Sequence, residues 1–204
     1  MALRIGITGN IGAGKTTVCR DFERLGVAVY YADVRAKELM NENPVLRRSI
    51  VNDFGPDSYG PDGRLDRAYL AERVFTDPAA LARLNAHVHP TVAEDAAAWH
   101  RRQRGPYTLH EAAILLEIGS RDQYDGMIVV SCPYPIRMAR VMQRDGISEE
   151  DFAARADKQW TDERKAAAAD FLIHNDGRQL LLPQILATDR QLRRRAHQSL
   201  PAGV

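Results

Sequence analysis

Residues 9–16 have the types and spacing of a loop that binds phosphate groups. They read GNIGAGKT and fit the pattern G-x-x-x-x-G-K-[ST]. Glycines let the backbone turn tightly and bring amide N–H groups inward around phosphate oxygens. Lys15 is placed to reach the β- and γ-phosphates of a nucleoside triphosphate, and the Thr16 hydroxyl is a ligand for Mg²⁺. The motif therefore predicts a site for a triphosphate and its magnesium ion.

The stretches on either side of this loop support the same interpretation. Residues 3–8 are a short apolar run typical of a buried strand, and residues 15–25 are compatible with a helix. Such a helix directs its positive N-terminal end at the bound anion. The alternative, a glycine-rich turn with a chance lysine, does not explain both flanking elements. The residues expected to contact the nucleotide are Asn10, Ile11, Gly12, Ala13, Gly14, Lys15, Thr16 and Thr17.

An aspartate, Asp33, follows directly on a second predicted strand at 27–31. The carboxyl ends of parallel strands line the ligand crevice of an open sheet. We expect this strand to lie beside the strand that leads into the phosphate loop. Asp33 would then accept the proton of an attacking hydroxyl group and orient it toward the γ-phosphorus. It is equally suited to cap the helix that follows, and the two roles are compatible.

Two glutamates lie at and after the end of the third predicted strand, 107–111. Glu111 closes that strand and can hold Mg²⁺, directly or through its waters. A purely structural carboxylate is the other interpretation. Glu117 comes after Leu115 and Leu116 and can hydrogen-bond a substrate or start a helix.

Five arginines lie on predicted helical segments within residues 137–164. In a phosphate-binding protein they suggest a lid that closes over the triphosphate. Acidic residues are interspersed among them, so a solvated charged helix face is an equal alternative. The five are Arg137, Arg140, Arg144, Arg155 and Arg164.

Asn175 and His89 are further candidates for ligand contact. Asn175 lies in the turn His174-Asn175-Asp176-Gly177, which could wrap the nucleotide base, although any loop of this composition looks alike. His89 precedes a proline within a helical stretch, and packing or substrate contact are its two expected roles. The histidines do not have zinc spacing with a cysteine pair.

The composition is that of an ordinary globular chain. Its 204 residues, 45% of them hydrophobic, suffice for one core domain with a small insertion. The net charge of +1 creates no field that favours nucleic acid or a membrane surface. Cys19 and Cys132 are far apart and typical of buried thiols in a reducing compartment. We therefore expect a cytoplasmic protein with neither nucleic-acid nor membrane partners, and no oligomeric state is predicted.

Strands alternate with helices along the chain, which predicts an α/β fold with a parallel five-stranded sheet and helices on both faces. The predicted strands are 3–8, 27–31, 107–111, 127–131 and 170–173. The predicted helices are 15–25, 33–41, 44–53, 66–75, 78–104, 135–144, 148–157, 162–168 and 178–195.

About 75 residues separate the second strand from the third, far more than a crossover needs. We expect this stretch, about 33–104, to be an inserted helical subdomain that holds the substrate. The core would then comprise about 1–32, 105–136 and 168–197, and the lid about 137–167.

Several short motifs occur in an order and at a spacing that resemble the dephospho-CoA kinase family. They extend from residue 4 to about 186 and include the loop, Asp33, Asp62–Arg67, His89-Pro90, Leu115-Leu116-Glu117, Arg140, Arg155 with Gln159, and Asn175-Asp176-Gly177. The resemblance departs at two places. Tyr31 stands where the family usually has an aspartate, and Ala113 replaces the family's proline.

The resemblance implies a P-loop kinase fold with a helical CoA-binding subdomain and a lid. It implies transfer of the ATP γ-phosphate to the ribose 3′-hydroxyl of dephospho-CoA. By this resemblance, Asp33 is the base and Lys15 and Arg140 assist catalysis. Arg140 and Asn175 are expected to contact the nucleotide. The residues expected at the acceptor are Thr8, Asp33, His89, Glu111, Leu115, Glu117 and Arg155.

Two alternatives share parts of this pattern. Nucleoside monophosphate and shikimate-type kinases have the same loop and lid plan, but the long helical insertion argues against them. A non-catalytic nucleotide switch would need a guanine-reading Asn-Lys-x-Asp run, which the sequence lacks. Asp33 and an insertion large enough for an acceptor would also have no purpose in a switch.

Overall fold

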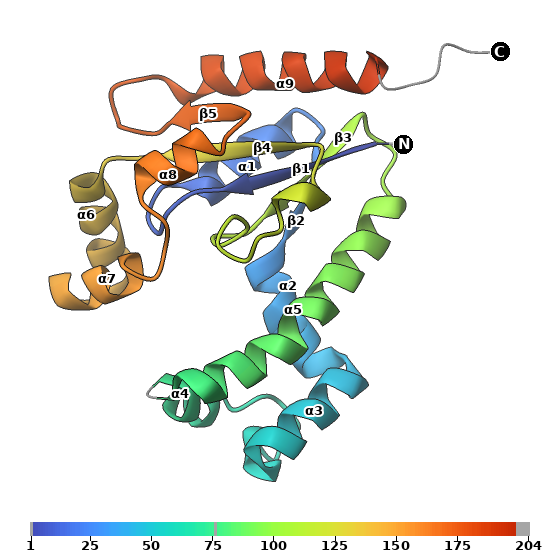
Figure 1. The fold of residues 1–204 in the computed structure, drawn as a ribbon, viewed down its shortest axis with the longest axis vertical. Helices are drawn as coiled ribbons and strands as arrows, with labels where there is room; N and C mark the ends of the chain where they lie inside the picture. The colour runs from blue at the N-terminus through green and yellow to red at the C-terminus, as the bar shows by residue number, and fades with distance from the viewer. Residues whose placement is uncertain (1, 76, 199–204) are drawn as a thin grey trace. The chain divides into compact units, whose positions relative to one another are not determined.

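The computed structural model describes residues 2–75 and 77–198, and it contains a five-stranded sheet (Figure 1). Every neighbouring pair of strands is parallel, in the order β2-β3-β1-β4-β5. The predicted α/β class with a parallel five-stranded sheet is thereby confirmed, and each strand end lies within one residue of its predicted position. The strands are β1 (Leu3–Thr8), β2 (Ala28–Tyr31), β3 (Tyr107–Glu111), β4 (Gly126–Ser131) and β5 (Phe171–His174).

The order of the strands corrects one expectation from the sequence. β3 lies between β2 and β1, so the strand before Asp33 is not the neighbour of the strand before the phosphate loop. Parallel strands are joined by crossovers that can skip a position, and hydrophobic periodicity carries no information about that choice. Glu111, at the end of β3, is consequently the nearer strand-end carboxylate in the sheet order.

One face of the sheet packs against helices α1 (Lys15–Arg24) and α9 (Leu181–Gln198). Alternate strand residues such as Ile5, Ile7 and Leu109 are fully buried on this face. Phe22 of α1 and Leu192 of α9 complete the same apolar core. The period of two along each strand therefore decides which residues build this layer.

The opposite face of the sheet is covered by the loop at 112–120, which follows β3, and by helix α8 (Asp162–Ala167). Gly6 of β1 belongs to this face, where a Cβ atom would lie 2.7 Å from the Met127 side chain and 3.2 Å from Leu115. A glycine at position 6 thus lets Met127 and Leu115 pack directly over β1. Helices α6 (Tyr134–Asp145) and α7 (Glu149–Ala156) precede α8 in the chain.

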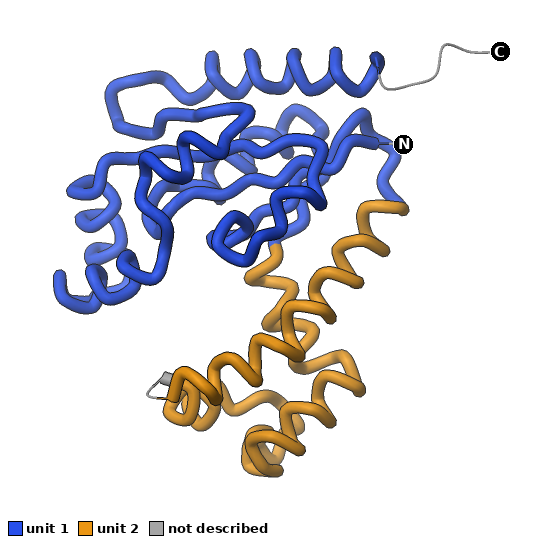
Figure 2. Tube along the Cα trace, in the orientation of Figure 1, with its two compact units in different colours: residues 1–31, 102–204 blue, residues 32–101 orange. Residues whose placement is uncertain are grey.

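Residues 32–101 form a second compact unit, which is all helical apart from one short bridge (Figure 2). Its own apolar core includes Leu46, Ile50 and Leu84. Asn43 caps the second of its helices, since its Oδ1 accepts the N–H groups of Val45 and Leu46. The helices are α2 (Ala32–Glu42), α3 (Pro44–Phe54), α4 (Arg67–Phe75) and α5 (Pro78–Arg101).

The sheet and its remaining helices make up the other unit, whose described residues are 2–31 and 102–198. Among the described residues, none of the helices is both long and apolar enough to cross a membrane.

Candidate nucleotide and acceptor site

The phosphate loop connects the end of β1 to the start of α1, the strand and helix context that its motif requires. Gly12 and Gly14 have φ angles of +79° and +88°, a region that favours glycine. A Cβ atom on Gly12 would lie 2.6 Å from the carbonyl oxygen of Arg137, and backbone cannot move aside easily. The loop therefore depends on glycine both for its turn and for its close approach to α6.

The N-terminus of α1 has the features of an anion site. Its N-cap residue is Gly14, and among the described residues no side chain caps the helix, whose positive N-terminal end therefore faces the loop. Lys15 donates a hydrogen bond from Nζ to the carbonyl oxygen of Gly9 at 3.0 Å and so spans the loop. Thr16 and Thr17 are exposed in the first turn of the helix. This arrangement fits a triphosphate with a magnesium ion at the Thr16 hydroxyl.

Asn175 and Arg140 lie beside the phosphate loop, although both come from distant parts of the sequence. Asn175 Nδ2 donates to the carbonyl oxygen of Ala13 at 2.8 Å. Arg140 Nη2 is 3.4 Å from Asn175 Oδ1, and its Nη1 is 3.3 Å from Cys132 Sγ. The structure therefore brings these two residues to the loop.

The other arginines of residues 137–164 have different environments. Arg137 is buried and forms an ion pair with Asp162 at 2.7 Å, which makes it part of the folded core. Arg144 and Arg155 are exposed, and both pair with Asp145. Arg137 Nη1 also reaches the carbonyl oxygen of Ile11 at 3.4 Å, so the guanidinium groups of both Arg137 and Arg140 lie at the phosphate loop. The fifth arginine, Arg164, lies over the ring of Trp160.

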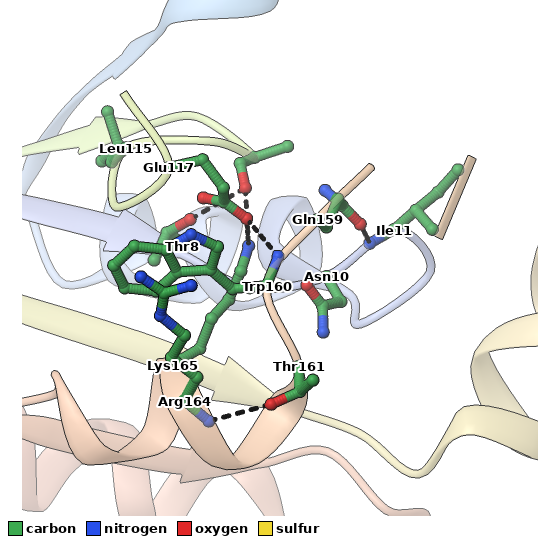
Figure 3. Close-up of polar contacts among 12 residues, drawn as sticks. Thr8, Asn10, Ile11, Leu115, Glu117, Gln159, Trp160, Thr161, Arg164 and Lys165 are labelled. Carbon is green, nitrogen blue, oxygen red and sulfur yellow. Dashed lines mark hydrogen bonds and ion pairs between the residues drawn. The ribbon is translucent and has the colours of Figure 1, made fainter. Parts of the chain in front are cut away.

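Residues 159–165, at and before the start of α8, contact the phosphate loop directly (Figure 3). Gln159 Oε1 accepts the backbone N–H of Ile11 at 2.8 Å. Asn10 Nδ2 donates to Asp162 Oδ1 at 2.7 Å, while Asn10 Oδ1 is buried and finds no hydrogen-bond partner in the described part of the chain. We call residues 159–165 the bridging segment, because its other end contacts the opposite loop.

That opposite loop is 112–120, which we call the post-β3 loop. Thr8, the last residue of β1, donates from Oγ1 to the carbonyl oxygen of Ala113 at 3.1 Å. Leu115 is buried against the sheet and Glu117 is nearly so. The backbone N–H of Trp160 donates to Glu117 Oε1 at 3.0 Å. Thr8, Leu115 and Glu117 are thus brought together at one end of the sheet.

Lys165 completes the contact between the bridging segment and the post-β3 loop (Figure 3). Its Nζ is 2.8 Å from Glu117 Oε1 and 2.9 Å from the carbonyl oxygen of Ala113. Burial lowers the pKa of Lys165 below its ordinary value, and the hydrogen bond and charge of Glu117 oppose that shift. A buried ion pair therefore joins two segments that are far apart in the sequence.

Glu111 lies at the end of β3, paired in register with Ile7 of β1 and Tyr31 of β2. It is buried. Burial, and to a smaller extent the Glu111 carboxylate, raises the pKa of the Cys19 thiol. Cys19 is therefore a packed, protonated thiol rather than a reactive one. Glu111 remains a candidate to bind a hydrated magnesium ion.

Asp33 and His89 belong to the helical unit. Asp33 stands in the first turn of α2, two residues beyond the last residue of β2. His89 is on α5, where burial lowers its pKa below the ordinary value. Their roles at the transfer site stay predictions.

Gln159, Asp162 and Lys165 are the site residues that sequence reasoning did not single out for their contacts. Gln159 was noted only as part of a motif, and Asp162 only as one of several interspersed acids. Lys165 stands in an alanine-rich helix and gives no local signal. Gln159 is 148 residues from its partner Ile11, Asp162 is 152 residues from Asn10, and Lys165 is 52 residues from Ala113. No motif spacing in the sequence relates residues so far apart.

A resident metal centre built from side chains is absent from the described parts of the chain, where no three His, Cys, Asp or Glu residues gather around one point. Magnesium in phosphoryl-transfer sites usually has one or two protein ligands and otherwise takes substrate phosphates and water. The residues present are consistent with that mode of binding.

Comparison with known proteins gives concordant results. A family model described as dephospho-CoA kinase matches residues 3–180. A dephospho-CoA kinase from Salinibacter ruber is 43% identical over 176 residues, covering 85% of this chain and 88% of the relative. The corresponding protein from Thermobifida fusca is 38% identical and covers 96% of this chain and 98% of its own. The crystal structure of TT1252 from Thermus thermophilus aligns with a TM-score of 0.81 and 31% identity over 95% of this chain and 97% of its own.

Proposed function

The chain belongs to the dephospho-CoA kinase family, and we propose that it transfers the γ-phosphoryl group of ATP to the ribose 3′-hydroxyl of dephospho-CoA. The products are CoA and ADP, and the reaction is the last step of coenzyme A biosynthesis. The observation that carries the proposal is the family match over residues 3–180, which includes both the phosphate loop and the post-β3 loop. ATP is the substrate that this family membership implies.

The nucleotide is assigned to the phosphate loop and its neighbours. The N–H groups of the loop and of the α1 N-terminus bind the phosphates, and Lys15 contributes positive charge at the β- and γ-phosphates. Arg140 supplies a further charge close to the transferred group, and Asn175 holds the loop through Ala13. These assignments are supported by the hydrogen bonds that already join Asn175 and Arg140 to this region.

We assign Mg²⁺ to the Thr16 hydroxyl, and the Glu111 carboxylate would accept hydrogen bonds from water molecules bound to the ion. When bound, the ion neutralises charge that develops on the phosphates. The exposed Thr16 hydroxyl in the first turn of α1 supports the assignment.

The chemical step is an in-line displacement. The acceptor oxygen forms a bond to the γ-phosphorus, the bond from phosphorus to the β,γ-bridging oxygen breaks, and ADP leaves with that electron pair. The proton of the attacking hydroxyl passes to the Asp33 carboxylate. Asp33 is assigned this role because it follows β2 at the carboxyl end of a parallel sheet, where such enzymes bind their ligands.

The acceptor is assigned to the post-β3 loop, and the resemblance adds His89 and Arg155 as further contacts. Thr8, Leu115 and Glu117 are held together by contacts within the sheet-containing unit. His89 contributes from α5 of the helical unit and Arg155 from α7.

An acceptor panel tests the proposed function. Release of ADP should require dephospho-CoA, and AMP or shikimate in its place should give only background rates. Mass spectrometry should find a product heavier than dephospho-CoA by one phosphoryl group. ADP release that is equally fast with AMP or shikimate would point to the rival small-molecule kinases, and release that is independent of any acceptor would point to a nucleotide switch.

The base assignment is tested by Asp33→Asn. The amide keeps the size of the side chain but takes up no proton, so kcat should fall by roughly 10²–10⁴-fold. The Kd for ATP, measured by isothermal titration calorimetry, should change by less than about twofold, a difference below 0.5 kcal/mol. Turnover of the variant at the wild-type rate would remove Asp33 from this role.

A further inference from the structure

Lys165 lies at a position where charge is costly, because its side chain has no exposed surface. A buried ammonium group needs a partner and full hydrogen bonding to be tolerated. Nζ has both, at 2.8 Å from Glu117 Oε1 and 2.9 Å from the carbonyl oxygen of Ala113. An apolar side chain of similar length would fill the same volume without that cost, so stability does not account for a lysine here.

The Glu117 carboxylate is satisfied on one oxygen and not on the other. Oε1 receives both the Lys165 ammonium and the backbone N–H of Trp160 at 3.0 Å (Figure 3). Oε2 is buried and has no hydrogen-bond partner within the described residues. An unsatisfied buried carboxylate oxygen costs free energy, which a donor group brought by a ligand would recover.

The carbonyl oxygen of Ala113 ties the same lysine to β1. It accepts from Lys165 and also from Thr8 Oγ1 at 3.1 Å. Thr8 directly precedes the phosphate loop. The orientation of the post-β3 loop is therefore fixed relative to the nucleotide site through one carbonyl group with two donors.

The bridging segment connects the phosphate loop to the post-β3 loop through contacts at its two ends. Its first residue, Gln159, accepts the N–H of Ile11 in the phosphate loop, and its last, Lys165, holds Glu117 in the post-β3 loop. The two loops are thus joined across seven consecutive residues. A shift of this segment would move the Glu117 carboxylate relative to the phosphate loop.

We propose that Lys165 is a positioning residue for phosphoryl transfer, which holds Glu117 so that its Oε2 accepts a hydrogen bond from a hydroxyl or amino group of dephospho-CoA. The inference rests on the proposed function. Lys165 touches neither the acceptor nor the transferred phosphoryl group, and it acts through Glu117 and through the carbonyl of Ala113.

A double-mutant cycle in the full chain tests this inference, with Lys165→Met, Glu117→Gln and the variant carrying both. Lys165→Met should raise the KM for dephospho-CoA about tenfold, since a charge-assisted contact is misplaced, and leave the Kd for ATP within about twofold. Added to Glu117→Gln, the lysine substitution should raise KM by less than about twofold further, because its effect passes through Glu117. Arg190→Met, a change of an exposed basic residue on α9, is the control for loss of a positive charge and should leave KM unchanged.

A purely structural lysine predicts a different pattern. Lys165→Met would then lower the thermal midpoint with the dephospho-CoA KM unchanged, or would raise that KM by the same factor with and without Glu117→Gln. Either result overturns the inference. Should Lys165→Met not fold, Lys165→Gln, which keeps a hydrogen-bond donor but loses the charge, takes its place in the cycle. Its increase in KM should be smaller than tenfold and should likewise disappear when Glu117→Gln is present. Wild-type protein that does not turn over dephospho-CoA at all would instead refute the proposed function, so the two failures are distinguishable.

Discussion

The phosphate loop and the post-β3 loop follow adjacent parallel strands, β1 and β3, but different forces hold them in place. The phosphate loop takes its turn from its own glycines, Gly12 and Gly14 at positive φ, and leads into a helix that starts at Lys15. The side chains of Gln159 and Asn175 then hydrogen-bond to its backbone. The post-β3 loop has a positive-φ glycine only near its end, at Gly119. Backbone hydrogen bonds hold this loop together and join its first residue, Ala112, to Ile7 of β1. The side chains of Thr8 and Lys165, which come from other elements, add two hydrogen bonds to its Ala113 carbonyl.

This difference separates two kinds of binding site. A loop that binds phosphate through backbone N–H groups needs glycines at fixed spacing, and few other residues serve. A loop that binds an organic acceptor through side chains can be held by any suitable partner that the fold brings near. Substitutions in the first loop should therefore act locally and strongly, and those in the second should act through partners and more weakly.

The largest effect is expected from Gly12→Ala. The added Cβ would lie 2.6 Å from the backbone oxygen of Arg137, at a φ of +79°, so the loop must shift and the Kd for ATP should rise by roughly 100-fold. Gly26→Ala is the matched control, since it has a φ of +82° with no atom within 4 Å of the new Cβ. It should lower stability by about 1–2 kcal/mol and leave ATP affinity unchanged. Equal ATP affinities for the two variants would contradict the idea that the loop needs glycine at position 12 because it packs against the backbone of Arg137.

A smaller effect is expected at His110, which precedes Glu111 on β3. Burial, together with the charge of Arg4, lowers its pKa from 6.5 to about 4, and Tyr124 Oη lies 3.0 Å from its Nδ1. The unfolded chain binds a proton at this residue below pH 6.5 while the folded chain does not. Its contribution to stability is therefore complete above pH 6.5 and is lost as the pH falls through 4, by roughly 2–4 kcal/mol.

Urea unfolding between pH 4 and 7 measures this contribution. The wild type should lose more stability over that range than His110→Asn, and the difference between the two curves isolates the histidine from the carboxylates that titrate nearby. If the free energies of unfolding of the two proteins fall in parallel with pH, His110 does not make the stability of β3 depend on pH.

The smallest effect is expected from Thr8→Val, which removes one of two donors to the Ala113 carbonyl. Lys165 keeps that oxygen satisfied, so the KM for dephospho-CoA should rise only about threefold, equivalent to less than 1 kcal/mol. ATP affinity should stay at the wild-type value. Thr188→Val, at a buried threonine of α9, provides the control for loss of a hydroxyl. A KM increase as large as that of Lys165→Met would reverse the ranking of the two donors.

The sequence predicted the elements of the fold well and their arrangement less well. Short apolar runs such as Met127–Val130 are strands because buried parallel strands are apolar on both faces. The position of β3 between β1 and β2 was not predicted, since crossover connections leave no trace in the residues of the strands themselves. We therefore expected Asp33 to follow the strand next to β1. In the structure that neighbouring strand is β3, which ends in Glu111.

The candidate site divides in the same way. Lys15 and Thr16 were predicted from spacing alone, and Arg140 and Asn175 from motif order. Arg137 was grouped with the lid arginines, but its side chain is buried and forms an ion pair with Asp162. Helical periodicity does not distinguish a charge that faces a ligand from one that faces an internal carboxylate.

The sequence by itself determined the phosphate loop, because glycine spacing, a strand before it and a helix after it are local properties of the chain. Only the tertiary structure decided that Gln159 meets Ile11 and that Lys165 meets Glu117. Those contacts join residues 148 and 48 positions apart, and they arise when the order of parallel strands and the path of α8 bring the segments together. The conformation of the phosphate loop depends on residues adjacent in the sequence, whereas a buried ion pair forms only when the fold brings distant residues together.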